Sequence, residues 1–523
     1  MNLAHLAEQD LNERGEYPKL VFEGRSYTNR DLYDLSCRLA GGLKGLGIGA
    51  DDRVVVFLAN CPEVLISYPA IWRVGAVTVP VLQVLEAHEL AYILKDSRAK
   101  AIITSADLVD KVREAQRMAE VPELHVVAVT EGKAEVAAPT LSFEKLSEST
   151  ADLVIEPREK NDLAVVLYTS GTTGRPKGVM QSHHNLSANA HNSYNSAKTR
   201  DPSEVSLIVL PLAHTFGLST LVSGYLFGGK GVLVRRFHPA ETLALIAEHK
   251  VAIMSGVPTM FMYMLMMPGQ FDTSSMKRWI VGAAPMPVEQ LNKFEQRFGG
   301  TMHVGYGLTE ASPTIAFERE DEPRKPGSTG RPVEGVEVRI VGEDGSELAR
   351  GEVGEICARG ENITLGYLGM PDATAETFKD GWLHTGDMGL LDDDNYLFVV
   401  ERKKDLIIRG GLNIYPKDVE EVLYRHPAVR ECAVVGVPDV MMGEQVAAVV
   451  VLREGATATA EELIAHCQST LAKYKTPRYV EFVAELPKTT IGKIQKKELR
   501  KWASEKLAAQ EASEASEAVG AGA

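Results

Sequence analysis

A lysine set among small and hydroxyl-bearing residues is the strongest chemical feature of the chain. It lies in the stretch YTSGTTGRPKGVM, from Tyr168 to Met180. The glycines allow successive backbone N–H groups to converge on an anion, and the serine and threonines add hydroxyl donors. Lys177 supplies a mobile positive charge. The stretch therefore predicts a loop that binds a polyphosphate, with an ordinary flexible surface loop as the alternative.

The spacing of this loop differs from that of the common phosphate-binding motif GxxxxGK[ST]. Its glycines and lysine follow the pattern GxxGxxK, and Pro176 precedes the lysine. A closer match is GYLFGGKG, from Gly224 to Gly231, which has glycine where the magnesium-binding serine or threonine belongs. We interpret that second segment as a strand followed by a turn, with Lys230 on the surface.

Short apolar runs alternate with helical patterns through the first part of the chain. DDRVVVFLAN, AVTVPVL and AKAIITSA are typical of strands, whereas YTNRDLYDLSCRLAGGLKGLG has apolar residues at helical spacing. This alternation predicts α/β layers with mostly parallel sheets. After about residue 325, strands joined by glycine and aspartate turns predict antiparallel sheet or a small barrel. Beyond the run ERKKD (401–405) the pattern becomes mixed again, which indicates a domain boundary there.

Length, charge and cysteine content narrow the class of protein. A chain of 523 residues is too long for one hydrophobic core, so two or three domains are expected. The net charge of −15 disfavours nucleic acid or an anionic membrane as the main partner. The five cysteines form no CxxC pair, and we expect reduced thiols in a cytoplasmic protein. We expect no signal peptide, because the start of the chain carries acidic residues early and lacks basic and apolar segments. We expect no membrane-spanning helix, because no apolar run reaches the required length of roughly 18–20 residues.

Further motifs follow the phosphate loop in a definite order. They are PLAHTFGL (211–218), GAAP (282–285), YGLTE (306–310), GEVGEICARG (351–360), GWLHTGD (381–387), ERKKDLIIRGGLNIYP (401–416) and LPKTTIGKIQKKELR (486–500). Together they resemble the ordered motifs of the adenylate-forming (ANL) superfamily, and this resemblance covers nearly the whole chain. The resemblance is to its branch of acyl-CoA synthetases and fatty-acid–CoA ligases.

The resemblance implies a large N-terminal adenylation (AMP-binding) domain of α/β layers with a β-barrel-like subdomain, and a small mobile α+β C-terminal domain. We place these domains at residues 1–400 and 406–507, with a hinge at 401–405 and a disordered tail at 508–523. Two half-reactions are implied: a carboxylate and ATP give acyl-AMP and pyrophosphate, and a thiol then displaces AMP to give a thioester. ATP, Mg²⁺ and coenzyme A are the implied small molecules.

The resemblance also assigns roles around the nucleotide. Thr309 would donate to the α-phosphate, Glu310 would hold Mg²⁺, and Tyr306 would pack against adenine. A hard cation prefers oxygen ligands, so a glutamate with phosphate oxygens suits magnesium. Asp387 would accept hydrogen bonds from the ribose hydroxyls, and Arg402 would join it there. The predicted ATP and AMP contacts are Thr169, Ser170, Gly171, Thr172, Thr173, Gly174, Lys177, Gly282, Ala283, Ala284, Tyr306, Gly307, Thr309, Asp387 and Arg402.

Lys493, in TTIGKIQ, resembles the catalytic lysine of the superfamily. It would bridge the attacking carboxylate and the α-phosphate, stabilising charge that develops in the transition state. Lys488, Lys496 and Lys497 nearby are expected to be solubilising surface residues of much smaller effect. The predicted catalytic residues are Lys493, His214, Thr309 and Glu310.

The two half-reactions imply movement of the small domain, because the catalytic lysine serves the first step and a thiol tunnel serves the second. Alignment on the arginine of ERKKD places the pivot at Lys404. Superfamily members usually carry glycine before that arginine, whereas this chain has Glu401. Without the resemblance, the charged run would be interpreted as a solvated surface. The coenzyme A tunnel would be lined by Gly410, Gly411 and Asn413, where glycines allow close approach of pantetheine.

The acyl pocket is expected from three stretches, PLAHTFGLS, GVPTMFMYMLMM and VGAAPMP. His214 resembles the histidine beside the substrate carboxylate. No acidic residue lies between Pro211 and Ser219, which disfavours an α-amino acid. Methionines adapt to irregular apolar shapes, and this favours a medium- or long-chain fatty acid as the substrate, with an aromatic or alicyclic acid as the alternative. Most methionines of these stretches are nevertheless expected in the core. The predicted pocket residues are His214, Phe216, Met260, Gly282, Met286 and Gly305.

Coenzyme A is the expected acceptor, because neither a carrier-protein domain nor a large N-terminal insertion is recognisable. A ligase that loads a carrier protein and a luciferase-like oxygenase are the alternative enzymes. A protein that only binds nucleotide is disfavoured by the presence of Lys177, Glu310, Asp387 and Lys493. The expected partners are therefore a carboxylic acid, ATP and coenzyme A, without nucleic acid or integral membrane association. The oligomeric state stays open, with a homodimer as one alternative.

Overall fold

The structure of the protein is a computed structural model, and the residues it describes are 2–132, 136–169, 175–197, 201, 203–489 and 494–507. Internal contacts divide the chain into two compact units. The first unit contains Met1–Ala283, Phe294–Val338 and Cys357–Thr385, and the second contains Ala284–Lys293, Arg339–Ile356 and Gly386–Ala523. The predicted hinge, residues 401–405, falls within the second unit, and the predicted domain limits stay a prediction.

The first unit contains a seven-stranded sheet. Its strands lie in the order β7 (Leu141–Ser142), β6 (His125–Val129), β5 (Ala99–Ser105), β3 (Arg53–Phe57), β4 (Val77–Pro80), β8 (Leu163–Thr169) and β9 (Lys177–Ser182). All neighbours are parallel except β8 and β9. Along β3, Val54 and Val56 join one hydrophobic cluster while Val55 and Phe57 join another. Both faces of the sheet are therefore buried, as parallel sheets require.

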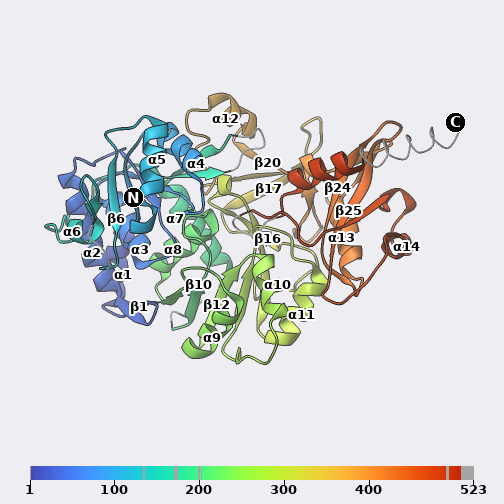
Figure 1. Ribbon diagram of the computed structural model, residues 1–523, viewed down its shortest axis with the longest axis horizontal. Helices are drawn as coiled ribbons and strands as arrows, with labels where there is room; N and C mark the ends of the chain where they lie inside the picture. Colours follow the sequence, from blue (N-terminus) through green and yellow to red (C-terminus); the bar gives the residue numbers. More distant parts are fainter. Residues whose placement is uncertain are drawn as a thin grey trace. The chain divides into compact units, whose positions relative to one another are not determined.

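Helices cover both faces of this sheet (Figure 1). One face carries α4 (Ala87–Asp96) and α5 (Val109–Ala119), and the other carries α2 (Asn29–Gly45) and α3 (Pro62–Arg73). Leu90 and Val112 join the cluster of the first face, and Leu39 and Val64 join that of the second. The other helices of this unit are α1 (His5–Arg14), η1 (Ala106–Leu108), α6 (Phe143–Leu146), α7 (His183–Ala197), α8 (Thr215–Phe227), α9 (Pro239–His249), α10 (Pro258–Met266), η2 (Thr309–Ala311) and α12 (Pro371–Thr377).

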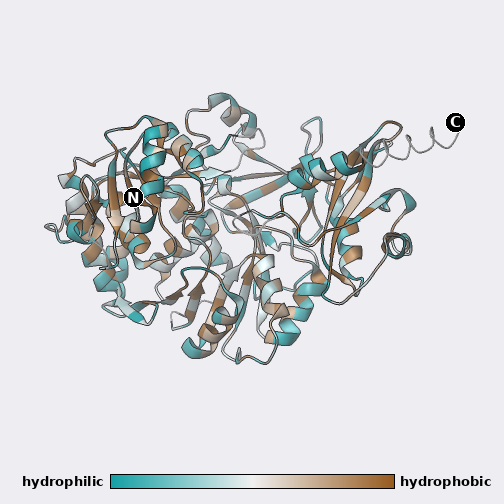
Figure 2. Ribbon diagram, in the orientation of Figure 1, coloured by the Kyte–Doolittle hydropathy of each residue, from teal (hydrophilic) through white to brown (hydrophobic). Residues whose placement is uncertain are grey.

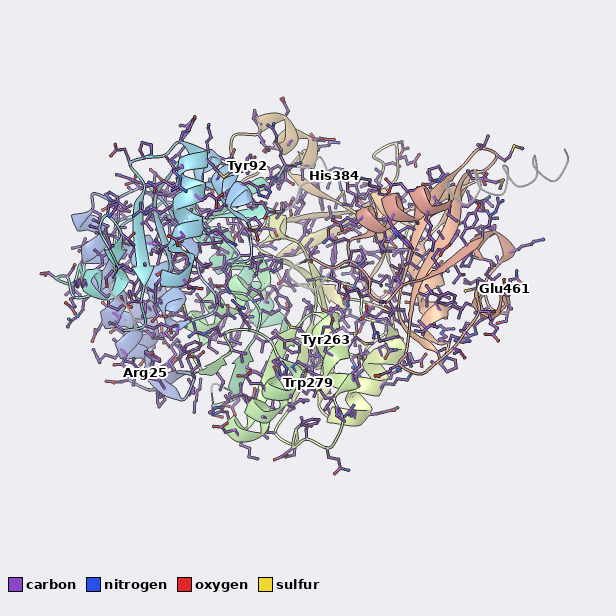
Figure 3. The ribbon with its side chains drawn as sticks, in the orientation of Figure 1. Arg25, Tyr92, Tyr263, Trp279, His384 and Glu461 are labelled. Atoms are coloured by element: carbon purple, nitrogen blue, oxygen red, sulfur yellow. The ribbon has the colours of Figure 1, made fainter. Side chains whose placement is uncertain are left out.

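A nine-stranded sheet also belongs to the first unit. Its strands lie in the order β16 (Arg331–Pro332), β15 (Thr314–Phe317), β14 (Thr301–Gly307), β13 (Arg278–Val281), β12 (Val251–Gly256), β10 (Val205–Ile208), β11 (Lys230–Leu233), β1 (Pro18–Phe22) and β2 (Arg25–Thr28). The strands from β14 to β1 are parallel. Trp279 of β13, labelled in Figure 3, is fully buried and meets Phe294 edge to face, with 4.9 Å between ring centroids. The carboxyl ends of β12, β13 and β14 thus share one edge, where α/β sheets commonly bind ligands.

The division between the units passes through elements near the middle of the chain. A five-stranded sheet there has the order β17 (Val336–Val341), β18 (Gly354–Gly360), β20 (Trp382–Leu391) and β19 (Phe378–Lys379), with β21 (Leu397–Arg402) also paired to β20. The helix α11 (Val288–Phe298) crosses the division as well. The hairpins of β19 with β20 and of β20 with β21 are antiparallel, as the glycine and aspartate turns predicted.

The second unit contains a mixed sheet that is covered on both faces. Its strands lie in the order β23 (Leu412–Ile414), β22 (Ile407–Arg409), β25 (Gly443–Leu452) and β24 (Val429–Asp439), with β26 (Tyr479–Phe482) parallel to β25. Strands β24 and β25 are largely hydrophobic (Figure 2). Leu423 and Leu463 pack on one face, and Leu499 and Ala503 pack on the other. The helical elements are η3 (Lys403–Asp405), α13 (Pro416–Tyr424), α14 (Ala460–Gln468), η4 (Lys473–Lys475) and residues 496–507.

The predicted α/β fold class is confirmed, whereas the interpretation of the segment from Gly224 to Gly231 is wrong. That segment is the end of α8 followed by the start of β11. A helix forms there because Leu221, Val222 and Tyr225 are buried in the core cluster, so tertiary packing overrides local preference. Within the described residues, no helix combines the length and apolar character needed to cross a membrane.

Candidate active site

The predicted phosphate loop connects β8 to β9 in the first unit. These strands pair antiparallel, and Thr169 lies opposite Lys177 where the pairing ends. The hairpin thus places Lys177 at the start of β9, next to the loop. The central loop residues lie outside the described residues; they are Ser170, Gly171, Thr172, Thr173 and Gly174.

Two tyrosines hold the frame of this loop. The Tyr168 hydroxyl donates to an Asp96 oxygen at 2.6 Å, and the hydroxyl of Tyr92, labelled in Figure 3, donates to the Pro176 carbonyl at 3.0 Å. The two rings meet edge to face, with 6.3 Å between centroids. Gly178 allows this close packing, because a Cβ there would lie 2.9 Å from a valine methyl of β8. The base of the loop is therefore rigidly supported.

Tyr367 joins the phosphate loop to the YGLTE segment, and no sequence motif had singled it out. Its hydroxyl donates to Glu310 Oε1 at 2.8 Å, and its ring centroid lies 4.7 Å from Lys177 Nζ. Burial, together with the Glu310 charge, raises the pKa of Tyr367, so the phenol remains a donor. One ring thus positions the carboxylate and the ammonium that were predicted to hold Mg²⁺ and phosphate. The only local signal was an aromatic residue directly after a glycine.

The YGLTE segment turns sharply after β14. Gly307 is required there, because a Cβ would overlap the Pro313 carbonyl oxygen, which also accepts the Leu308 N–H at 3.0 Å. Thr309 begins η2, and its carbonyl accepts the Gln181 side-chain amide at 3.0 Å. The turn is therefore fixed by contacts from β9 and from the residues that follow it. Tyr306 is the penultimate residue of β14.

Three of the predicted pocket residues lie together at the carboxyl ends of β13 and β14. A Cβ on Gly282 would lie 3.3 Å from the Gly305 carbonyl oxygen and 3.4 Å from Phe216 Cε1. Gly282 therefore leaves space beside the phenylalanine ring, whereas Gly305 adjoins Phe317. Ala283 follows in a left-handed conformation, with φ of 68°, which turns the chain away from the strand. Ala284 belongs to the second unit.

The other predicted pocket residues have different surroundings. His214 caps α8, and its Nδ1 accepts the backbone N–H two residues further on at 3.3 Å, which ties the ring to the helix start. Met260 is half-buried in α10. Met254 and Met264 are fully buried core residues, whereas Met266 is 51% exposed, so the expectation that most methionines of this region lie in the core holds only in part. Met286 is buried and belongs to the second unit.

Asp387 and Arg402 form the predicted pair in the second unit. They lie opposite one another in β20 and β21, and Arg402 Nε is 2.8 Å from Asp387 Oδ1. The aspartate side chain is 7% exposed and the arginine side chain 37%, so the guanidinium is the more accessible member. A carboxylate held by an arginine at the end of a hairpin can accept hydrogen bonds from hydroxyl groups.

Two family models match the chain. The first, described as AMP-binding enzyme, matches residues 7–368, and the second, described as AMP-binding enzyme C-terminal domain, matches residues 418–493. The chain belongs to the AMP-binding, adenylate-forming enzymes. Its predicted superfamily is therefore confirmed.

Known relatives of this AMP-binding enzyme are CoA ligases. It is 37% identical over 507 residues to a long-chain-fatty-acid–CoA ligase of Bacillus subtilis (strain 168), covering 92% of this chain and 90% of the relative. It is 37% identical over 482 residues to a feruloyl-CoA synthase of an Amycolatopsis species, covering 91% and 94%. ATP-bound MatB of Rhodopseudomonas palustris has a TM-score of 0.89 and 31% identity, covering 96% of this chain and 99% of that one. The protein is an AMP-forming acid–thiol ligase of the acyl-CoA synthetase class.

The predicted pivot and tunnel residues of this ligase lie in the second unit. Lys404 is the central residue of η3. Gly410 and Gly411 turn the chain between β22 and β23 with φ of 58° and 80°, and the Gly410 N–H donates to the Met442 carbonyl at 2.7 Å. Asn413 lies in β23. The hydrogen bond to Met442 thus stabilises the turn between β22 and β23, while the contact of this turn with coenzyme A stays a prediction.

The predicted catalytic Lys493 lies outside the described residues, but its neighbour Lys496 is described. The expectation that Lys496 is a solubilising surface residue is wrong. Its side chain is only 18% exposed, and its Nζ lies 3.1 Å from Glu401 Oε2 and 3.0 Å from Glu420 Oε1. Both carboxylates are distant in the sequence, so no local pattern could show that they surround this lysine.

Binding of nucleotide-associated Mg²⁺ stays a prediction, and the chemistry of that ion can be compared with the residues present. Among the described residues, no group of three or more His, Cys, Asp and Glu side chains could hold a metal by itself. Mg²⁺ commonly takes one or two carboxylates and completes its shell with phosphate oxygens and water. Glu310 fits this chemistry, because the Tyr367 hydroxyl orients one of its oxygens.

Proposed function

We propose that this ligase converts a medium- or long-chain fatty acid to its coenzyme A thioester through an acyl-adenylate. The observation that supports this most is the arrangement of Lys177 and Glu310 around Tyr367. It places a cation and a carboxylate, the groups that a magnesium–triphosphate requires, at the phosphate loop and at the end of β14. We keep the cytoplasm as the proposed location, because all five cysteines are free and buried.

In the first half-reaction, the loop and Lys177 bind the β- and γ-phosphates, and Thr309 donates to the α-phosphate. Glu310 would hold Mg²⁺, which would supply positive charge opposite that of the phosphates. Asp387 accepts hydrogen bonds from the ribose hydroxyls. A carboxylate oxygen of the acid attacks the α-phosphorus, the bond to the bridging oxygen breaks, and pyrophosphate leaves. Lys493 stabilises the charge of this transition state, so catalysis depends on positioning and electrostatics.

In the second half-reaction, the coenzyme A thiol loses its proton and attacks the acyl carbonyl, and AMP leaves. The small domain turns about Lys404 between the two steps. Gly410 and Gly411 then line the path of pantetheine, since a backbone without side chains allows its close approach.

The acid is selected by the space beside Phe216. Gly282 leaves this space open, and no acidic residue lies between Pro211 and Ser219 to pair with an amino group. An aromatic acid is the second candidate, because the feruloyl-CoA synthase relative has the same 37% identity as the fatty-acid ligase and a flat ring would pack against the phenylalanine.

A panel of acids tests this proposal. Pyrophosphate and AMP release are measured with Mg-ATP and straight-chain, aromatic or alicyclic acids, each with and without coenzyme A. We expect coenzyme A-dependent AMP release with medium or long straight chains. Turnover with aromatic acids alone would replace the proposed substrate class. Pyrophosphate exchange that ignores coenzyme A would indicate a carrier-protein acceptor, and oxygen uptake with light emission would indicate an oxygenase.

A further inference from the structure

A buried ion triplet includes Glu401, the first residue of the predicted hinge. It joins Lys496 to Glu401 and Glu420, whose side chains are 18%, 10% and 17% exposed. Burial lowers the pKa of the Lys496 ammonium, but the two carboxylates outweigh this effect and the pKa is raised overall. Burial raises the pKa of Glu401 despite the nearby ammonium. Such a group, shielded from water and salt, differs from an exposed surface ion pair, which contributes little.

A second cation of the same helix reaches the other side of the hinge. Arg500 Nη2 donates to the Lys404 carbonyl at 3.3 Å and lies 3.3 Å from Asp405 Oδ1. Lys496 and Arg500 are four residues apart within helical residues 496–507, so both project from one face of the helix. The helix therefore contacts the chain on both sides of the predicted pivot. Lys496 contacts Glu401 before it, and Arg500 contacts the Lys404 carbonyl and Asp405.

Glu401 also adjoins the predicted ribose pair. It lies opposite Met388 in β20 and β21, and the neighbouring residues Asp387 and Arg402 lie opposite each other. Successive residues of a strand point to opposite faces. Glu401 is therefore held by Lys496 from one face of the strand, while Arg402 reaches Asp387 from the other.

Chain order links these contacts to movement. Glu401 precedes the predicted pivot, whereas Lys496 and Glu420 follow it. A turn of the small domain about Lys404 must therefore separate Lys496 from Glu401. A contact that holds only one arrangement biases a two-state equilibrium toward that arrangement.

We propose that Lys496 and Arg500 form a two-point clamp across residues 401–405, which positions the Asp387–Arg402 pair and opens when the small domain turns. This proposal rests on the proposed function, because the clamp would hold the arrangement used in one half-reaction and open for the other. Neither cation is assigned a contact with substrate, so both are positioning residues.

The test compares Lys496→Met with a matched control, Lys488→Met, in the full-length enzyme. Lys488 Nζ lies 2.9 Å from Glu431 in the same unit, and its side chain is also 18% exposed. Both variants remove one mostly buried ammonium, so a merely structural loss affects them alike. Adenylation is measured as acid-dependent pyrophosphate release, and thioester formation as conversion of supplied acyl-AMP by coenzyme A. We expect the ratio of the two rates to change at least about fivefold in Lys496→Met and to stay near that of the unmodified enzyme in Lys488→Met.

The conservative variant Lys496→Arg should restore the ratio, because it keeps a cation between the two carboxylates. Equal ratios in the two methionine variants overturn the clamp. If Lys496→Met does not fold, the same comparison is made with Arg500→Gln and its control Arg478→Gln, which removes the ion pair with Asp439 at 3.0 Å.

A second readout does not depend on activity. Trypsin cleaves after lysine and arginine, so cleavage after Arg402, Lys403 and Lys404 reports opening of the hinge. We expect Arg500→Gln to be cleaved there several-fold faster than Arg478→Gln, and equal cleavage overturns the clamp. If the unmodified enzyme performs neither half-reaction while Arg500→Gln is cleaved faster, the proposed function fails and the clamp stands.

Discussion

The two units build their polar sites in different ways. In the first unit, close backbone approaches shape the site: Gly307 lies against a carbonyl, and Gly282 leaves room beside a ring. In the second unit, long charged side chains form ion pairs, as between Asp387 and Arg402 and around Lys496. Glycine and hydroxyl patterns are visible in a sequence, whereas a set of ion partners is decided by the fold.

The buried carboxylates Glu318 and Glu401 illustrate this difference between the two units. Glu318, which is 6% exposed in the first unit, accepts the Val304 N–H at 2.9 Å. Burial raises its pKa to about 7. Glu401 in the second unit has an ammonium 3.1 Å away. Burial raises the pKa of both carboxylates, but Glu401 contacts an ammonium, which it shares with Glu420.

The largest expected effect concerns Lys493. Lys493→Ala should lower adenylation by about 100- to 1000-fold, because a positioned charge at the transition state is lost. Conversion of supplied acyl-AMP to thioester should continue. The two half-reactions are measured separately, as pyrophosphate release and as thioester formation. Equal loss of both would contradict this division of labour.

The second prediction compares Glu401→Gln with Glu318→Gln. Glu401→Gln should lower the free energy of unfolding at pH 8 by about 1–2 kcal/mol, because the charged contact with Lys496 is lost while Glu420 still pairs with that ammonium. Glu318→Gln should raise it, because the amide cannot ionise. Chemical denaturation at several pH values measures both. Equal destabilisation by the two substitutions would remove the distinction between the two carboxylates.

The pH dependence of Glu318 has a definite sign. Below its ordinary pKa of 4.5 the carboxyl is protonated in both the folded and the unfolded chain, so it does not make the free energy of unfolding depend on pH. Between pH 4.5 and about 7 only the unfolded chain ionises, and stability falls as pH rises. At about 1.4 kcal/mol per pH unit, the advantage of Glu318→Gln should reach about 3 kcal/mol above pH 7. An advantage that does not grow with pH would contradict the raised pKa.

The smallest expected effect tests Tyr367. Tyr367→Phe keeps the ring beside Lys177 but removes the hydrogen bond to Glu310, so adenylation should fall about tenfold, corresponding to about 1.4 kcal/mol. The Mg²⁺ concentration needed for half-maximal rate should rise as well. The control Tyr92→Phe removes the bond to the Pro176 carbonyl, and its Mg²⁺ dependence should stay unchanged. The same Mg²⁺ dependence in both variants would contradict the role given to Tyr367.

Much of the fold could be predicted from local patterns. The runs interpreted as strands became β3, β4 and β5, and the helical pattern after Tyr27 became α2, which begins with a capping box between Thr28 and Asp31. The end of α8 was missed because aromatic residues favour a strand and glycines favour a turn locally, while burial in the core selects helix.

Residues of the candidate site that belong to sequence motifs could be predicted, whereas a residue whose partners are distant in the sequence could not. Gly282 lies beside both the Gly305 carbonyl and the Phe216 ring, and the assignment of these residues to the acyl pocket stays a prediction. Tyr367 was missed, because its partners Lys177 and Glu310 come from distant segments of the chain.

The sequence by itself determined the family, the order of its motifs and the α/β class, because hydrophobic period and small-residue loops are local properties. Tertiary structure decided which charges meet. It buried Lys496 between Glu401 and Glu420, and it brought Arg500 to the hinge. A lysine in a charged run has the same local sequence whether it faces water or a buried carboxylate, since burial depends on what packs against it.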